Sequence, residues 1–185
     1  MRRILDDLNE AAWRFRFWYS SGRMLHYTLS IMDSAIEATG TRANVKQAVP
    51  FFGVTDMESS LRFYVDGLGF VIKRHWIPQR DEEYPADGKI RWCWLELGDA
   101  AIMLQEFMPQ ARPREELGTG ASVSFMCEDA LALYREFKSR GVQTRNRPSV
   151  GNGLWVVPLT DPDGHRIEFS SPTDAPEESE LEESA

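Results

Sequence analysis

The sequence is poor in the residues that build metal centres and disulfide scaffolds. Its 185 residues include only two cysteines and three histidines. Cys93 and Cys127 match no zinc-binding spacing and are too few for a disulfide scaffold. Each lies in a strand-like segment, where a buried reduced thiol is expected. His26, His75 and His165 are far apart and define no ligand pair, and the sequence shows no nucleophile–histidine–acid arrangement or phosphate-binding glycine loop.

Long hydrophobic runs are also missing. No segment approaches the roughly 20 apolar residues of a membrane-spanning helix. Asp6, Asp7 and Glu10 lie where a signal peptide would need an apolar stretch, so a cytoplasmic protein is expected. The net charge of −8 disfavours a nucleic acid partner, because a phosphate backbone would be repelled.

The composition divides the chain into three zones. Residues 47–172 form the expected folded domain, and a 42% apolar content is sufficient for a core. Residues 1–46 form an extension in which basic and aromatic residues alternate without a clean period. It is either poorly ordered or an interaction arm for a partner or a membrane surface. Residues 173–185 are acidic, which is typical of a disordered tail.

One pattern occurs twice within the folded domain. Residues 49–56 form an apolar strand that ends at Asp56, and residues 122–129 form another that ends at Asp129. Each aspartate is an expected N-cap of an amphipathic helix, over about 57–67 in the first copy, and a glycine follows each helix. Internal duplication of this kind predicts two modules, here residues 47–109 and 118–172.

Strand-like sequence follows each helix. In the first module the segments are 70–76, 91–97 and 100–107, with a turn at Gly98-Asp99. In the second module they are 142–148, 154–159 and 165–171, with a turn at 161–164. The sequence therefore predicts an α+β protein in which the order strand, helix, three strands is repeated.

This arrangement resembles the vicinal oxygen chelate superfamily, which includes glyoxalase I, extradiol dioxygenases and bleomycin-resistance proteins. The resemblance rests on VTDMESSLRFYVDGLGF, LELGDAAIMLQE and LTDPDGHRIEF. It implies two βαβββ modules whose curved mixed sheets surround a ligand cavity, usually in a homodimer. The family includes both enzymes and binding proteins, so the resemblance alone does not identify the function.

The resemblance also implies four positions for metal ligands. In this sequence they are Val49, Met103, Ser122 and Glu168. Only Glu168 has a side chain that a divalent ion favours, because such ions prefer several imidazole or carboxylate ligands. We therefore expect no metal and no other cofactor. If the protein is an enzyme, Glu168 is the candidate catalytic residue.

Strand alternation predicts which residues line the cavity. One face should pack beneath the helices, and the opposite face should bind the ligand. The predicted ligand-binding residues are Phe51, Trp92, Trp94, Glu96, Met103, Gln105, Ser122, Ser124, Trp155 and Glu168. Tryptophans beside carboxylates suit a flat or cationic ligand, although they could equally fill a collapsed cavity or a dimer interface.

Three hypotheses follow from the sequence. The first is a metal-independent protein of the bleomycin-resistance type that binds an aromatic or cationic small molecule in a homodimer, with a role in antibiotic resistance. The second is a glyoxalase-like lyase or isomerase, or a dioxygenase, that uses a divalent metal and an unusual ligand set including Glu168. The third is an interaction module that binds a partner through the N-terminal extension.

Overall fold

The computed structural model describes residues 44–79, 84–113, 117–118, 120–144 and 146–182. The chain divides into two units, residues 1–46 and 47–185, and the elements below all belong to the second unit. Most of the N-terminal extension, and with it the hypothesis of an interaction arm, lies outside the described residues. None of the described helices is long and apolar enough to cross a membrane.

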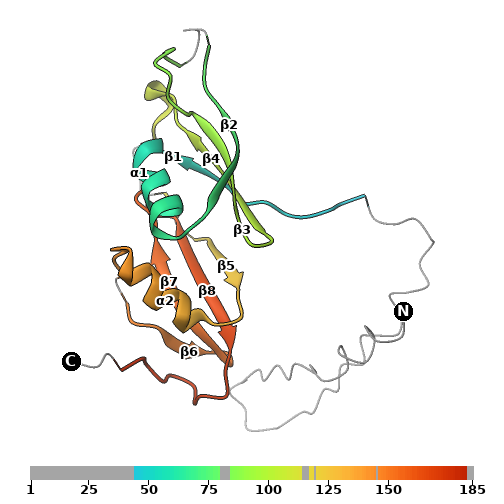
Figure 1. Cartoon of the computed structure of the whole chain (residues 1–185), viewed down its shortest axis with the longest axis vertical. Coiled ribbons are helices and arrows are strands. Elements are labelled where there is room, and N and C mark those ends of the chain that lie inside the picture. Colours follow the sequence, from blue (N-terminus) through green and yellow to red (C-terminus); the bar gives the residue numbers. More distant parts are fainter. Residues whose placement is uncertain (1–43, 80–83, 114–116, 119, 145, 183–185) are drawn as a thin grey trace. The chain divides into compact units, whose positions relative to one another are not determined.

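In its described residues, the first module contains four strands and one continuous helical segment, and a short 3-10 helix follows it (Figure 1). Strand β1 (Phe51–Val54) leads into helix α1 (Met57–Leu61), which continues as the π-helical turn η1 (Arg62–Gly67). The strands β2 (Val71–Trp76), β3 (Trp92–Leu97) and β4 (Ala100–Glu106) follow, and then a short 3-10 helix, η2 (Pro109–Ala111). The strand order in the first sheet is β1-β4-β3-β2, with β1 parallel to β4.

The second module repeats this topology. Its elements are β5 (Ser122–Met126), α2 (Ala130–Ser139), β6 (Ser149–Gly151), β7 (Leu154–Thr160) and β8 (Arg166–Pro172). The strand order in the second sheet is β5-β8-β7-β6, with β5 parallel to β8. The predicted α+β fold of two βαβββ modules is therefore confirmed.

The two helices begin at the predicted aspartates. The Asp56 carboxylate accepts hydrogen bonds from the Ser59 hydroxyl and from the amides of Ser59 and Glu58, and these bonds lower its pKa. The Asp129 carboxylate accepts one from the Ala132 amide. Gly69 and Gly141 follow the helices with φ angles of 85° and 83°, a conformation that favours glycine.

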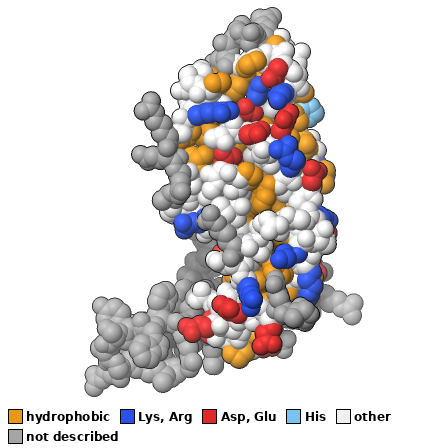
Figure 2. All heavy atoms as spheres, turned by 90° about the vertical axis from the view of Figure 1, so that its left-hand side faces the viewer, with side chains coloured by type: hydrophobic (Ala, Val, Ile, Leu, Met, Phe, Trp, Pro, Cys, Tyr) orange, Lys and Arg blue, Asp and Glu red, His pale blue; other side chains and the backbone are white. Residues whose placement is uncertain are grey.

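The core lies between each sheet and its helix. The residues that alternation assigned to the helix side of the strands are buried: Val54, Ile102, Leu104, Phe125, Ile167 and Phe169. The residues at helical spacing on the apolar helix faces meet them, among them Met57, Tyr64 and Phe137. Figure 2 shows the side of the molecule that carries the helices, on which acidic and basic side chains are interspersed.

Buried contacts between the modules explain why residues 47–185 form one unit. The Phe70 ring contacts the Tyr64 ring of its own module and the Phe125 ring of the second, each with centroids 5.8 Å apart. The Tyr64 hydroxyl donates a hydrogen bond of 3.0 Å to the buried carboxylate of Asp161. Burial raises the pKa of Asp161, and burial beside this carboxylate raises the pKa of Tyr64.

Two expectations about the C-terminal half need correction. The strand expected at 142–148 is formed instead by residues 149–151, which pair with β7 through a turn at Asn152 and Gly153. Pro148 lacks the amide hydrogen that a strand at 142–148 would need for pairing there. The strand-like composition of 142–148 was therefore misleading.

The acidic segment is the second correction, because residues 173–182 run beside β6 rather than forming a disordered tail. Val150 donates its amide to the Ser179 carbonyl, and the Glu178 amide donates to the Val150 carbonyl. The Glu177 carboxylate accepts hydrogen bonds from the amides of Asn152 and Gly153. The sheet edge offers unpaired backbone groups that this segment satisfies, while its acidic side chains stay exposed to solvent.

Candidate functional site: the open face of the first sheet

The register of the first sheet brings several predicted ligand-binding residues together on the side away from α1, called here the open face. Met103 lies between Phe51 on β1 and Trp94 on β3. In the next row, Gln105 is paired with Trp92. Paired residues on neighbouring strands point to the same side of a sheet. The predicted cluster of Phe51, Trp92, Trp94, Met103 and Gln105 is therefore contiguous.

A β-bulge in β2 adds residues that strand alternation alone did not identify. The register between β2 and β3 shifts between Ile72 and Arg74. After the shift Arg74 pairs with Trp94, and Trp76 pairs with Trp92, so both side chains lie on the open face. Without a bulge they would point to the helix side. No feature of the VIKRHW segment indicates this extra residue.

Tyr84 closes one end of this aromatic group. Its ring contacts the Trp76 ring edge-on, with centroids 5.7 Å apart. The Gln105 amide donates a hydrogen bond of 3.1 Å to the Tyr84 oxygen, and the Tyr84 hydroxyl donates to the Glu106 carbonyl at 2.6 Å. These contacts fix the orientation of both Tyr84 and Gln105. The open face thus carries five aromatic residues: Phe51, Trp76, Trp92, Trp94 and, buried at one end, Tyr84.

Glu96 is already engaged by its neighbours. Its carboxylate accepts a hydrogen bond of 2.9 Å from the Trp94 indole and lies 3.9 Å from the Lys73 ammonium. The first interaction orients the Trp94 ring, because the indole has a single donor. The second offsets the carboxylate charge. Glu96 therefore positions Trp94 and contributes little net negative charge to the open face.

The predicted residues of the second module form a separate group. Ser122 and Ser124 on β5 pair with Arg166 and Glu168 on β8. These four residues lie on the side of the second sheet away from α2, because Val123 and Phe125 point to the core. The group contains two hydroxyls, one guanidinium and one carboxylate but no aromatic ring.

Trp155 was assigned to the wrong face. It pairs with Ser171, whose hydroxyl accepts a hydrogen bond from the Ala130 amide at the start of α2. Trp155 also packs against the core, as do Val157 and Leu159, which follow it at alternate positions in β7. Its side chain therefore lies on the helix side. The prediction failed because the apolar run LWVVPL gives no clear alternation.

The positions of the family's metal ligands do not suit a metal in this chain. Val49 offers a hydrocarbon, Met103 a thioether and Ser122 a neutral hydroxyl, which leaves Glu168 as the only strong oxygen donor. In the described part of the chain, no group of three or more histidine, cysteine, aspartate or glutamate side chains could hold a metal ion.

Among the described histidines and cysteines, His165 and Cys93 pack within the domain, whereas His75 is exposed. The His165 ring stacks on Phe52 with centroids 4.5 Å apart, and its Nε2 lies 2.8 Å from the Gly53 carbonyl oxygen. His75 is exposed on β2, opposite the buried Cys93. Burial raises the pKa of the Cys93 thiol to about 12, so it is not a nucleophile at neutral pH.

Large hydrophobic side chains are exposed on the open face and on the side of the second sheet away from α2. Phe51 is 56% exposed, Val71 54% and Trp76 44%, all on the open face of the first sheet. Met126, on the corresponding side of the second sheet, is 60% exposed. In the first sheet they lie on the two edge strands, β1 and β2, on either side of the Trp94 and Met103 side chains. Exposed apolar side chains on a sheet face typically mark an interaction or ligand-binding surface.

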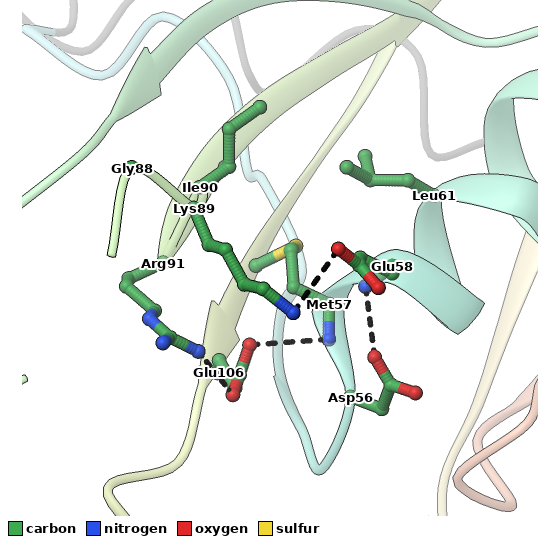
Figure 3. A pocket seen from close by; sticks show the side chains of 9 residues that line it. All are labelled: Asp56, Met57, Glu58, Leu61, Gly88, Lys89, Ile90, Arg91 and Glu106. Atoms are coloured by element: carbon green, nitrogen blue, oxygen red, sulfur yellow. Dashed lines mark hydrogen bonds and ion pairs between the residues drawn. The ribbon is translucent and has the colours of Figure 1, made fainter. Parts of the chain in front are cut away.

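A pocket of about 290 Å³ lies on the other side of the first sheet, at the start of α1 (Figure 3). None of the ten predicted ligand-binding residues lines it. Its charged groups pair with one another: Arg91 bonds Glu106 at 2.6 Å, and Lys89 lies 3.2 Å from Glu58. The buried Glu106 carboxylate also accepts a hydrogen bond from the Met57 amide. We infer that the paired charges in this pocket stabilise the fold and do not bind a ligand.

Comparison with known proteins identifies the family. The model of the Glyoxalase/Bleomycin resistance protein/Dioxygenase superfamily matches residues 46–169, and the chain belongs to this superfamily. No curated protein matches the chain in sequence.

Solved structures of antibiotic-binding proteins share the fold. A bleomycin resistance determinant encoded on the transposon Tn5 is 24% identical, with a TM-score of 0.51 over 71% of this chain and 100% of that one. An antibiotic binding protein from Streptomyces sp. CB03234 is 21% identical, with the same TM-score and coverage. A bleomycin-binding protein from Streptomyces verticillus, complexed with copper(II)-bleomycin, is 19% identical, with a TM-score of 0.50 over 70% of this chain and 98% of that one. At these identities the likeness shows the fold.

Proposed function

We propose that this protein binds a planar aromatic small molecule on the open face of the first sheet, without a metal ion and without turnover. The observation that carries the proposal is the group of aromatic side chains on that face, in which Glu96 orients Trp94 and Gln105 orients Tyr84. Aromatic rings attract one another at stacking or edge-to-face distances by about 0.5–1.5 kcal/mol beyond the area they bury. Several fixed rings on one surface therefore favour a flat ligand.

The family supports this proposal without naming the ligand. Relatives include proteins that bind bleomycin, so a role in antibiotic resistance is one possibility for this chain, and bleomycin is one candidate ligand. The cationic preference predicted from the sequence depended on Glu96 and Glu168. Because Lys73 and Trp94 already engage Glu96, an aromatic ligand is better supported than a cationic one.

Calorimetric titration with 2-naphthamide, a neutral flat probe, and with bleomycin tests the proposal. We expect saturable binding of the naphthyl probe by the full-length protein. Trp94→Ala should weaken this binding about fivefold to tenfold, the effect of losing about 1 kcal/mol or more of ring contact. Trp155→Phe, on the helix side, should leave the affinity within twofold. Absence of naphthyl binding, or equal effects of the two substitutions, would contradict the proposal.

We also propose that the protein is a homodimer in which a second copy covers the open faces. The exposed Phe51, Val71, Trp76 and Met126 support this, since the area around such side chains is costly to leave in water. Closing the face would also exclude water from a bound ring. This arrangement fits the cytoplasmic location that we propose, where small metabolites and drugs are available.

Sedimentation equilibrium tests the dimer. Met126→Lys combined with Phe51→Lys should shift the protein from dimer to monomer, because a buried unpaired ammonium is strongly disfavoured. Val45 is 81% exposed but lies outside the strands, so Val45→Lys should leave the dimer intact. A monomeric wild-type protein at tens of micromolar, or no response to the double substitution, would refute the arrangement.

A further inference from the structure

We propose that the ligand carries an anionic group, such as a carboxylate, and that Arg74 recognises it. This inference rests on the proposed function and specifies the chemical class of the ligand. Its basis is the β-bulge in β2, which places Arg74 directly opposite Trp94 on the open face. The ligand would then be an aromatic anion, with its ring on the tryptophans and its charge at the guanidinium.

The bulge brings two cations to the open face in succession. Lys73 lies 3.9 Å from the Glu96 carboxylate, and Glu96 is paired across the strands with Val71 on this face. Arg74, the next residue, is paired with Trp94 on the same face. A regular strand would place consecutive side chains on opposite faces. The local irregularity therefore concentrates positive charge beside the aromatic group.

The pairing of these charges leaves Arg74 available for a ligand. Lys73 and Glu96 offset one another. In the described part of the chain, Arg74 has no ion pair or hydrogen bond from its side chain, and it is exposed. The arginine fork is suited to two parallel hydrogen bonds with a carboxylate. The first sheet thus offers an aromatic surface with one unneutralised positive charge at its side.

The residues around Arg74 favour one orientation of a bound aromatic anion. Trp94 is held by its hydrogen bond to Glu96, so its ring has a fixed position relative to Arg74 across the strand pair. At the end of the aromatic group away from Arg74, beside Trp76, Gln105 and Tyr84 are bonded to each other and carry no charge. A flat anion would therefore bind in one orientation, with its anionic group toward β2 and its ring over β3.

The proposal contrasts with the net charge of −8. A protein with this overall charge repels anions at long range, and the effect is screened beyond about 8 Å at physiological ionic strength. Recognition at contact distance depends instead on the local pairing of charges. Weak long-range repulsion and strong local attraction are compatible for a small ligand.

Three naphthyl probes of similar shape test the inference by calorimetry on the full-length protein. They are 2-naphthoate, the neutral 2-naphthamide and the cationic 2-naphthylmethylammonium. We expect naphthoate to bind about tenfold more tightly than the amide, the size of one hydrogen bond between charged groups, and more tightly still than the cation. Raising the salt concentration should reduce this preference.

Arg74→Gln should weaken naphthoate binding about tenfold while leaving naphthamide within twofold. Arg135→Gln is the matched control, because Arg135 is an exposed arginine on α2 and the substitution changes the net charge equally. It should change neither affinity by more than twofold.

The outcomes separate the two proposals. If naphthamide binds but naphthoate has no advantage, or Arg74→Gln leaves that advantage intact, the anionic ligand is refuted while aromatic binding stands. Equal losses from Arg74→Gln and Arg135→Gln would also refute it, since they would reflect net charge alone. If none of the three probes binds, the proposed function fails, and the inference fails with it.

Discussion

Arg91→Leu is expected to lower the free energy of unfolding by about 3–5 kcal/mol, the usual effect of removing one partner of a buried ion pair. The Arg91 side chain is only 9% exposed, and its guanidinium bonds Glu106 and Asp87, each at 2.6 Å. Glu106 is 12% exposed at its side chain, so the substitution leaves its carboxylate buried without a counter-ion. Chemical denaturation at neutral pH measures the loss.

Two variants of the pocket at the start of α1 are controls for Arg91→Leu. Lys89→Leu removes the ion pair between Lys89 and Glu58, whose side chains are 50% and 59% exposed. Exposed ion pairs contribute only about 0–1 kcal/mol to the free energy of unfolding. The double substitution Arg91→Leu with Glu106→Leu should recover most of the stability, because it removes both charges together. If Arg91→Leu costs no more than Lys89→Leu, the pocket at the start of α1 is not held by its buried ion pair.

Arg91→Leu should also weaken ligand binding at the open face. The Arg91 guanidinium carbon lies 5.9 Å from the centre of the Tyr84 ring, and Tyr84 in turn contacts Trp76 and Gln105. Arg91 therefore supports the loop that closes the aromatic group, although it lines the pocket on the other side of the sheet. Weaker binding of 2-naphthamide by Arg91→Leu, in conditions where the variant is folded, would reveal this link.

Phe70→Ala is expected to destabilise the protein by about 3–5 kcal/mol, the range measured for removal of a buried aromatic ring. Phe70 is 1% exposed and contacts Tyr64 in its own module and Phe125 in the other. The cavity would open where the two modules meet, so unfolding should also lose cooperativity. Far-ultraviolet circular dichroism and tryptophan fluorescence would then report different denaturation midpoints.

Phe70→Leu is the matched control, because it retains most of the buried apolar volume. Volume-conserving substitutions in a core cost less than about 1.5 kcal/mol, so this variant should unfold as one unit. Equal stability of the alanine and leucine variants would show that the contact between the modules does not depend on the Phe70 ring.

The sequence predicted the elements that local chemistry controls. Asp56 and Asp129 cap their helices because a side-chain carboxylate can accept bonds from the free amides of the first turn. Gly69 and Gly141 follow the helices because the chain there takes a positive φ angle. The turn at 161–164 and the alternation of Ile102, Leu104, Ile167 and Phe169 follow from the same short-range rules.

The sequence could not predict the features that depend on pairing between strands. The bulge at β2 depends on how that strand fits against β3, and it moved Arg74 and Trp76 to the open face. Trp155 lies on the helix side because β7 is in register with β8, which the uniformly apolar run around it does not reveal. Residues 173–182 are ordered because the edge of β6 accepts them.

The sequence by itself determined the repeated βαβββ architecture, the helix boundaries and the unsuitable donors at the family's metal positions. Caps, turns and binary patterns act over a few residues, and the donors are a matter of residue type alone. Only the tertiary structure decided which aromatic and charged side chains share one face. That choice depends on register and on a single extra residue in one strand, and one extra residue is enough to reverse every side chain that follows.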